Sequence, residues 1–309
     1  MESAPRGEKT VFQLKAKNDA GRAATPVLRG SLMGHRVLAE LGHKDLVTSY
    51  LVADPADGTL QTLKHVQRHT AADEERCRRL AAEYEIGRRL EHAGIRRVSS
   101  LRRDRKGFRV REVGLFQQYV DGPTLDRWDV PSTDAILGLM EQVGQALSHV
   151  HDQGLVHGAI RPRHILVDAT GSPRLIGFAE AAEAGIAFPG GQGNSGYSSP
   201  EQFLGGIRTA RADVFGFAAT MAAVILRARL EMPKPAELNA ADWLDLHQEW
   251  VDSLRQGGGS EGMNRLLEQC LHPDPTRRPV GIEEVVFRLR QLQAVVDPGK
   301  RGDPLRRAA

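Results

Sequence analysis

The chain has 309 residues, of which 40% are hydrophobic and 26% are charged, and its formal net charge is +3. This composition is typical of a globular protein and excludes a chain that is disordered throughout. A nucleic-acid binder usually combines clustered charge with aromatic residues. Because aromatic residues make up only 5% of this chain, no nucleic-acid partner is expected. The two cysteines, Cys77 and Cys270, match no metal-ligand spacing, so they predict no metal site.

No stretch of the sequence approaches the roughly 20 apolar residues that a helix needs to span a bilayer. The most apolar stretch, residues 214–226, is shorter than that and predicts a buried helix. The first five residues lack the charged-then-apolar pattern of a signal peptide. We therefore expect a cytoplasmic protein without a membrane span.

The first part of the chain predicts strands after an irregular start. Residues 1–32 are rich in Lys, Arg, Ala and Gly and predict a flexible N-terminal arm. Apolar and β-branched residues between turn-prone residues then predict strands, at 37–39, 48–53 and 60–66. A helix follows at 71–90, where apolar residues recur at helical spacing. Two further strands are predicted, one at 98–103 with 107–110 and one at 114–120.

Beyond Gly122 the pattern becomes mostly helical. Helices are predicted at 133–153, 211–228, 240–256, 260–271 and 281–295. Residues 297–309 have no apolar periodicity and predict a disordered basic tail. A small strand-rich part followed by a larger helical part indicates an α+β fold with two lobes.

Residues 155–168 carry the most specific motif, Leu-Val-His-Gly-Ala-Ile-Arg-Pro-Arg-His-Ile-Leu-Val-Asp. It resembles the catalytic loop of eukaryotic-type Ser/Thr protein kinases, His-Arg-Asp-(Leu)-Lys-Pro-x-Asn-(Ile)-Leu. Residues 175–179, Leu-Ile-Gly-Phe-Ala, stand where that family has Asp-Phe-Gly. Further matches are Pro200-Glu201 for the end of Ala-Pro-Glu, residues 213–216 for the start of the buried central helix, and residues 274–279 for a late Asp-Pro-x-x-Arg-Pro element.

The strand-rich part fits the same family. Lys64 resembles the strand lysine that contacts nucleotide, and Glu83 resembles the helix glutamate that pairs with it. The matches occur in the family's order from about residue 36 to residue 292. The resemblance therefore implies a two-lobed protein-kinase-like domain at 33–296, with the N-lobe at about 33–120 and the C-lobe at about 123–296.

The catalytic positions of the family are altered here. The catalytic Asp is Ala159, the following lysine is Arg161, and the metal-binding Asn is His164. The metal-binding Asp of Asp-Phe-Gly is Gly177. Phosphoryl transfer depends on positioning and on charge neutralisation by metal ions, which these residues do not supply in the usual way. We expect no intact catalytic residue and no magnesium site. The activation-segment threonine is also replaced, by Asn194.

The nucleotide pocket is altered as well. Of the three glycines of the phosphate loop only Gly42 remains, and Asp45 adds a negative charge there. Two residues that sandwich adenine in the family are the more polar Ser49 and Thr62. The residues that could still form the pocket are Lys64, Glu83, Gly42, Gln118, Val120 and Leu166. The resemblance implies that no cofactor is required and that ATP binds at most weakly and without metal.

The family's structural residues are retained. The resemblance implies that His157 packs beside Phe178 in an internal hydrophobic column, and that Asp213 accepts hydrogen bonds from the backbone of the catalytic loop. It also implies a buried ion pair between Glu201 and Arg278. The column position on the helix is glycine, Gly87, so we expect the column to be short and the helix loosely held.

Two features have alternative interpretations. The pair of Lys64 and Glu83 is either a nucleotide contact or a structural link between strand and helix. A cluster of basic residues on the fourth strand and its turn is either a solvated hairpin or a docking face for an acidic or phosphorylated partner; it comprises Arg96, Arg97, Arg102, Arg103, Arg105, Lys106, Arg109 and Arg111.

These observations predict a pseudokinase of bacterial type that acts as a signalling scaffold or allosteric regulator. Its partners are expected to be proteins, such as an active kinase or a phosphoprotein. The alternative is a residual or unconventional ATP-dependent Ser/Thr kinase or other phosphate or nucleotidyl transferase, which needs a carboxylate such as Glu180 or Asp45 in the cleft. A third hypothesis is a structural module whose pocket is closed.

Overall fold

A computed structural model describes six stretches of the chain, namely residues 30–44, 46–130, 132–190, 196–226, 240–257 and 260–296. The tail predicted at 297–309 and most of the predicted arm, residues 1–29, lie outside these stretches, as do Asp45 and Asn194.

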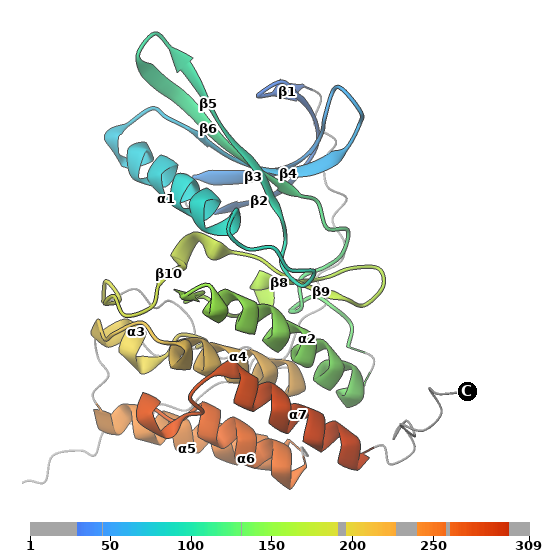
Figure 1. The fold of residues 1–309 in the computed structure, drawn as a ribbon, viewed down its shortest axis with the longest axis vertical. Coiled ribbons are helices and arrows are strands. Elements are labelled where there is room, and N and C mark those ends of the chain that lie inside the picture. Colours follow the sequence, from blue (N-terminus) through green and yellow to red (C-terminus); the bar gives the residue numbers. More distant parts are fainter. Residues whose placement is uncertain are drawn as a thin grey trace, which may run out of the picture.

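The small lobe is a six-stranded antiparallel sheet in the order β1-β2-β3-β4-β6-β5 (Figure 1). Its strands are β1 (Ser31–Leu32), β2 (His35–Lys44), β3 (Val47–Ala53), β4 (Leu60–Gln67), β5 (Val98–Lys106) and β6 (Arg109–Gln118). The two faces carry separate apolar clusters. Leu63 and Phe116 lie in one, and Leu115 packs with Leu80 of the helix α1 (Ala71–Gly87) in the other. Alternating side-chain direction along β6 explains why Leu115 and Phe116 face opposite sides.

Helix α1 begins at Ala71 because Thr70, before the helix, and Asp73, in its first turn, satisfy each other's backbone groups. Thr70 has an extended backbone, and Asp73 accepts hydrogen bonds from the backbone N–H of Thr70 at 2.7 Å and of His69 at 2.9 Å. This is a capping box, in which the N-cap residue and the third helical residue satisfy each other. The helix ends at Gly87, three residues before the predicted end.

The predicted strands after α1 form one hairpin, β5–β6, with a boundary that differs from the prediction. The segment 107–110 was assigned with the preceding strand, but Gly107 and Phe108 form the turn and Arg109 begins β6. Gly107 has φ of +61°, a conformation that glycine adopts without strain.

The large lobe is helical, as predicted (Figure 1). Its helices are α2 (Thr133–Asp152), α3 (Pro200–Leu204), α4 (Ala210–Ile225), α5 (Ala240–Gln256), α6 (Glu261–Cys270) and α7 (Ile282–Val296). Helix α4 is buried along most of its length, which explains why its sequence is apolar on all sides. No helix within the described stretches is long and apolar enough to cross a bilayer.

Short elements between the lobes position the candidate site (Figure 1). Two small antiparallel pairs join β7 (Leu155–Val156) to β10 (Ala182–Glu183) and β8 (Ile165–Val167) to β9 (Pro173–Leu175). The 3₁₀ turns η1 (Pro162–His164), η2 (Phe178–Glu180) and η4 (Pro275–Arg277) complete the large lobe. Leu175 of β9 also bonds to the small lobe, since its N–H donates to Gly94 and its carbonyl accepts from the Arg96 N–H.

Candidate functional site

The site lies where the loop after β7 meets the segment after β9. The ring centroids of His157 and Phe178 are 4.6 Å apart, as the sequence led us to expect. The His157 Nε2–H donates to the carbonyl of Ile176 at 3.1 Å, and Nδ1 accepts from the Ala159 N–H at 3.2 Å. Burial lowers the pKa of His157, so its imidazole is neutral. His157 therefore acts as a packed core residue that joins the two segments.

Asp213, at the start of α4, fixes the backbone of this loop from below. Its carboxylate accepts from the N–H of His157 at 2.7 Å and of Gly158 at 2.8 Å. A third contact, which the sequence did not indicate, is His151 Nε2 at 3.0 Å. Burial opposes ionisation of Asp213, but these hydrogen bonds hold its pKa below the usual value.

Glu201 and Arg278 form the ion pair expected from the sequence. Their side chains meet in a bidentate arrangement with N···O distances of 2.7 and 3.0 Å. The guanidinium also donates to the carbonyls of Arg211, His272 and Pro273. This pair ties the start of α3 to the loop before α7.

His164 and Gly177, which stand at the two metal-ligand positions of the family, are in contact. The His164 Nδ1–H donates to the carbonyl of Ala159 at 2.7 Å, and Nε2 accepts from Arg161 at 3.0 Å. A Cβ atom placed on Gly177 would lie 2.8 Å from Cγ and Nδ1 of His164. The imidazole therefore occupies the space into which any side chain at position 177 would extend.

The surroundings of His164 keep its ring neutral and leave it unsuited to binding Mg²⁺. Burial, and then the nearby Arg161 guanidinium, lower the pKa of His164 well below its usual value, so the ring is neutral. Both ring nitrogens of His164 are already in hydrogen bonds, and neither residue has a side-chain oxygen of the kind that Mg²⁺ prefers as a ligand. Within the described stretches there is no group of three or more His, Cys, Asp or Glu side chains that could hold a metal ion.

Lys64 and Glu83 are joined, as the sequence suggested, but within a larger network. Lys64 Nζ lies 2.6 and 2.8 Å from the two oxygens of Glu83, which is 1% exposed. Glu83 also accepts from Gln117 at 3.4 Å, and Gln117 accepts from the guanidinium of Arg96 at 2.6 Å. Burial opposes ionisation of Glu83, but Lys64 and Arg96 hold its pKa below the usual value.

Arg96 corrects the prediction for the basic cluster. It was grouped with the hairpin arginines, yet it is only 7% exposed, and burial lowers its pKa to about 10. Sequence reasoning missed it because an isolated arginine gives no signal of burial unless its partners, Gln117 and Glu83, are known.

Gly87 corrects a second expectation. A Cβ atom at this position would lie 2.3 Å from Cγ2 of Val98. The space that the missing side chain was expected to leave empty is thus filled by Val98, from the first residue of β5. Because the two residues are complementary, the glycine allows close packing rather than a gap.

The remaining predicted pocket residues lie on elements around the junction of the lobes. Gly42 lies on β2 and Gln118 ends β6, and both are exposed. Val120 is buried, and Leu166 of β8 is partly buried. Val120 and Leu166 are therefore the apolar residues of this set, and Gly42 and Gln118 add no charge to it.

Arg208 is a site residue that the sequence comparison did not reveal. The family's catalytic-loop arginine is replaced by Gly158, whose φ is +69°. Arg208, from the loop before α4, brings its Nη1 to within 3.2 Å of where a Cβ on Gly158 would lie, and it donates to the carbonyl of Glu180 at 2.9 Å. Its guanidinium also lies 4.3 Å from the ring centre of Phe188. The sequence contained a signal for this contact, because the loop arginine is missing at Gly158 and an arginine is present further along the chain at position 208.

Glu180, a carboxylate required by the transferase hypothesis, is exposed at the end of η2. Its negative charge acts on Arg161. Burial lowers the pKa of Arg161, and the charge of Glu180 opposes that shift. The other candidate carboxylate, Asp45, lies outside the described stretches.

The fold, the ion pairs and the order of motifs agree with a comparison to protein families. Residues 36–287 match the family model described as "Protein kinase domain". The match covers most of the 309 residues, and the chain therefore belongs to the protein kinase family.

Bacterial Ser/Thr protein kinases are among the similar proteins. The chain is 26% identical to serine/threonine-protein kinase PrkC of Bacillus subtilis over 189 residues, which is 59% of this chain. It is 30% identical to PknA of Mycobacterium tuberculosis over 166 residues, or 51% of the chain, and 30% identical to PknI of the same species over 195 residues, or 60%.

These matches cover only part of each relative. The aligned parts amount to 28% of PrkC, 38% of PknA and 31% of PknI. The likeness therefore concerns the kinase domain.

Proposed function

We propose that this chain is a pseudokinase, a member of the kinase family that acts by binding a protein partner. The observation that carries the proposal is the contact between His164 and Gly177. With an imidazole filling the space beside residue 177, the two positions that hold metal ions in active kinases hold a neutral, hydrogen-bonded ring.

Loss of transfer follows from the chemistry of the remaining groups. Phosphoryl transfer relies on divalent ions that neutralise charge on the phosphates, and on a base that positions the acceptor hydroxyl. A positioned general base alone typically contributes a factor of about 10²–10⁴ in rate. Ala159 cannot act as that base, and Gly177 has no side chain to bind a metal ion. The residues present do not fit a magnesium-dependent reaction.

A binding role is supported by what the chain has kept. Asp213 still fixes the catalytic-loop backbone, and Glu201 still pairs with Arg278. Buried charges are costly unless they are paired, so their retention supports selection for the folded surface. The similarity to Ser/Thr kinases supports a signalling context, with an active kinase or a phosphoprotein as the partner. The two free thiols fit a reducing, cytoplasmic setting.

Nucleotide binding, in this proposal, is weak and independent of metal. The ammonium of Lys64 remains next to Glu83 and could meet phosphate oxygens without a metal bridge. Arg161 adds a second cation, which donates a hydrogen bond to the neutral ring of His164. The network from Glu83 through Gln117 to Arg96 gives the Lys64 pair a structural role as well.

A phosphate-transfer assay tests the proposal. The chain is incubated with labelled ATP and either Mg²⁺ or Mn²⁺, and label is measured on the chain and on a generic acceptor protein. We expect no transfer above that of the Lys64→Ala variant. Robust metal-dependent transfer that Lys64→Ala abolishes would contradict the proposal.

The transferase hypothesis is tested in the same assay. It requires turnover that depends on a cleft carboxylate, so Glu180→Gln or Asp45→Asn would reduce the rate. Turnover that survives both substitutions together would exclude these carboxylates as its source.

A further inference from the structure

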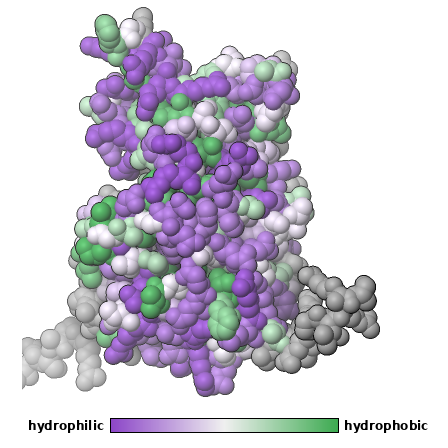
Figure 2. Space-filling view, viewed as in Figure 1, coloured by the Kyte–Doolittle hydropathy of each residue, from purple (hydrophilic) through white to green (hydrophobic). Residues whose placement is uncertain are grey.

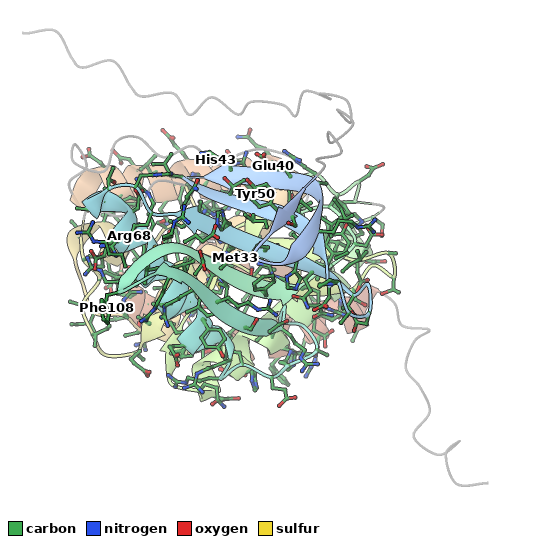
Figure 3. All side chains as sticks on the ribbon, turned by 90° about the horizontal axis from the view of Figure 1, so that it is seen from above. Met33, Glu40, His43, Tyr50, Arg68 and Phe108 are labelled. Carbon is green, nitrogen blue, oxygen red and sulfur yellow. The ribbon has the colours of Figure 1, made fainter. Side chains whose placement is uncertain are left out.

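The β5–β6 hairpin projects from the small lobe and ends in a single apolar side chain (Figure 1). Phe108 stands at its turn and is fully exposed, with a relative accessibility of 102%. Seen from above, Phe108 lies at the outer end of the hairpin, away from Met33 and Tyr50 over the middle of the sheet (Figure 3). An aromatic residue so placed adds nothing to the core, and exposure of its ring to water is unfavourable.

The hairpin is also strongly basic. From Arg97 to Glu112 there are seven basic residues and two acidic residues, Asp104 and Glu112. The basic residues are Arg97, Arg102, Arg103, Arg105, Lys106, Arg109 and Arg111. At the turn, the backbone of Lys106 pairs in register with that of Arg109. The hairpin sequence is therefore basic up to its tip.

The basic residues occupy both faces of the hairpin. Arg102 lies 4.8 Å from the ring centre of Phe116, on the face away from α1. Arg103 pairs in register with Val113, whose side chain belongs to the cluster under α1. Figure 2 shows a predominantly hydrophilic surface over this part of the small lobe. Positive charge therefore lies on both faces of the hairpin behind its apolar tip.

The neighbouring helix α1 provides a contrast. Its exposed arginines pair with carboxylates of the same helix: Arg78 and Arg79 both with Glu75. Among the described residues, no carboxylate lies within ion-pair distance of Arg103, Arg105 or Arg109 of the hairpin, nor of their neighbours Arg97, Arg102 and Arg111. The hairpin thus presents uncompensated charge.

We propose that the β5–β6 hairpin docks on an anionic membrane surface, with Phe108 inserted between headgroups and the arginines around it bound to lipid phosphates. Aromatic and basic side chains are favoured together at such interfaces, and anionic headgroups attract basic segments. When a hairpin enters a membrane by its tip, headgroups surround both of its faces, so charge on both faces is expected. An acidic protein partner would require charge chiefly on one face. The inference does not rest on the proposed function.

Sedimentation with lipid vesicles tests this inference on the full chain. Vesicles of phosphatidylglycerol and phosphatidylcholine in equal parts are compared with vesicles of phosphatidylcholine alone, at low and at physiological salt. We expect binding to the anionic vesicles only, and weaker binding as salt increases, because screening reduces the attraction.

Variants then locate the contact. Each arginine near an anionic surface contributes about fivefold in affinity, so Arg103→Ala with Arg105→Ala should weaken binding about 25-fold. Phe108→Ser should weaken it by about tenfold. Matched controls are Arg78→Ala with Arg79→Ala on α1 and Phe287→Ser on α7, whose side chains are also exposed and which should bind as the unaltered chain does.

Three outcomes would overturn the inference. The first is a lack of binding to anionic vesicles, which would leave an acidic protein as the partner of the hairpin. The second is binding that Phe108→Ser leaves unchanged, which would exclude insertion. The third is an equal loss of vesicle binding in the hairpin and control variants, which would show that the whole chain is attracted to the anionic surface nonspecifically. Because Phe108 is fully exposed, Phe108→Ser should unfold at the same temperature as the unaltered chain, which separates lost binding from lost folding.

Discussion

The imidazole of His164 occupies the space above the backbone of Gly177, so closely that a Cβ at position 177 would lie 2.8 Å from the ring. The two substitutions at the family's metal-ligand positions are therefore linked by packing. A carboxylate at position 177 would overlap the ring unless His164 moved or was replaced.

The first prediction concerns this contact. Gly177→Ala should lower the free energy of unfolding by about 3 kcal/mol, because it adds overlap with His164 to the strain of a side chain at φ of +86°. Gly107→Ala is the matched control, since Gly107 has φ of +61° and open space around it, and it should cost about 1 kcal/mol.

A double-mutant cycle in urea separates the two contributions. In the His164→Ala background, the loss of unfolding free energy caused by Gly177→Ala should be smaller by about 1–2 kcal/mol. If the two substitutions were additive, His164 would not occupy the space at position 177.

The second prediction concerns the ion pair of Glu201 and Arg278. Glu201→Ala should lower the free energy of unfolding by about 3–5 kcal/mol, because it leaves the enclosed guanidinium of Arg278 without its partner. The exposed pair of Glu261 and Arg265 on α6 is the control, and Glu261→Ala should cost less than about 1 kcal/mol. Similar values for the two variants in urea titrations would refute a structural role for the buried pair.

The third prediction uses Arg96 and its neighbour. Arg96→Ala should destabilise the chain by about 3 kcal/mol, since it removes a buried cation from the network of Gln117 and Glu83. Arg97→Ala, one residue further along and exposed, should change stability by less than about 0.5 kcal/mol. Thermal unfolding of the two variants provides the comparison, and equal midpoints would show that the network contributes little.

The fourth prediction is a dependence of stability on pH. The folded protein holds the pKa of His164 well below the unfolded value of 6.5. As pH falls below about 6.5, the unfolded state therefore binds a proton that the folded state does not, and stability decreases. The loss continues down to the folded pKa, with a slope near 1.4 kcal/mol per pH unit for this group.

The matching experiment compares His164→Asn with the unaltered chain. Unfolding free energies of both are measured from pH 7 to pH 5. His164→Asn should reduce the slope by about 1.4 kcal/mol per pH unit, the contribution of one proton. His157, whose pKa burial also lowers, keeps part of the dependence in the variant. An unchanged slope in His164→Asn would contradict the account.

The sequence predicted the fold because the matched motifs lie in fixed order and because helical and strand periodicities are local properties. It also indicated the partners of Lys64 and of Arg278, since these pairs recur at set positions in the family. It did not reveal that Val98 fills the space over Gly87 or that Arg96 is buried. Both depend on contacts between segments that are separated in the sequence, and no local pattern records them.

The altered site was partly predictable for the same reason. The positions of Ala159, His164 and Gly177 in the motifs identify them as departures from the family's catalytic residues. The contact of His164 with Gly177 and the approach of Arg208 to Gly158 join residues from different segments, and no sequence motif indicates them. The sequence thus indicates which groups are missing, whereas the structure shows what occupies their place.

The most direct test of the central claim is thermal unfolding with millimolar ATP, in magnesium and in chelator, on the unaltered chain and on Lys64→Ala. A site with a dissociation constant of about 0.1 mM would add about 1.4 kcal/mol at about 1 mM ligand, a shift of a few degrees at most. We predict that any shift is the same with and without magnesium and is absent in Lys64→Ala. A larger shift that appears only with magnesium would contradict the account, because it would require the metal site that His164 and Gly177 do not provide.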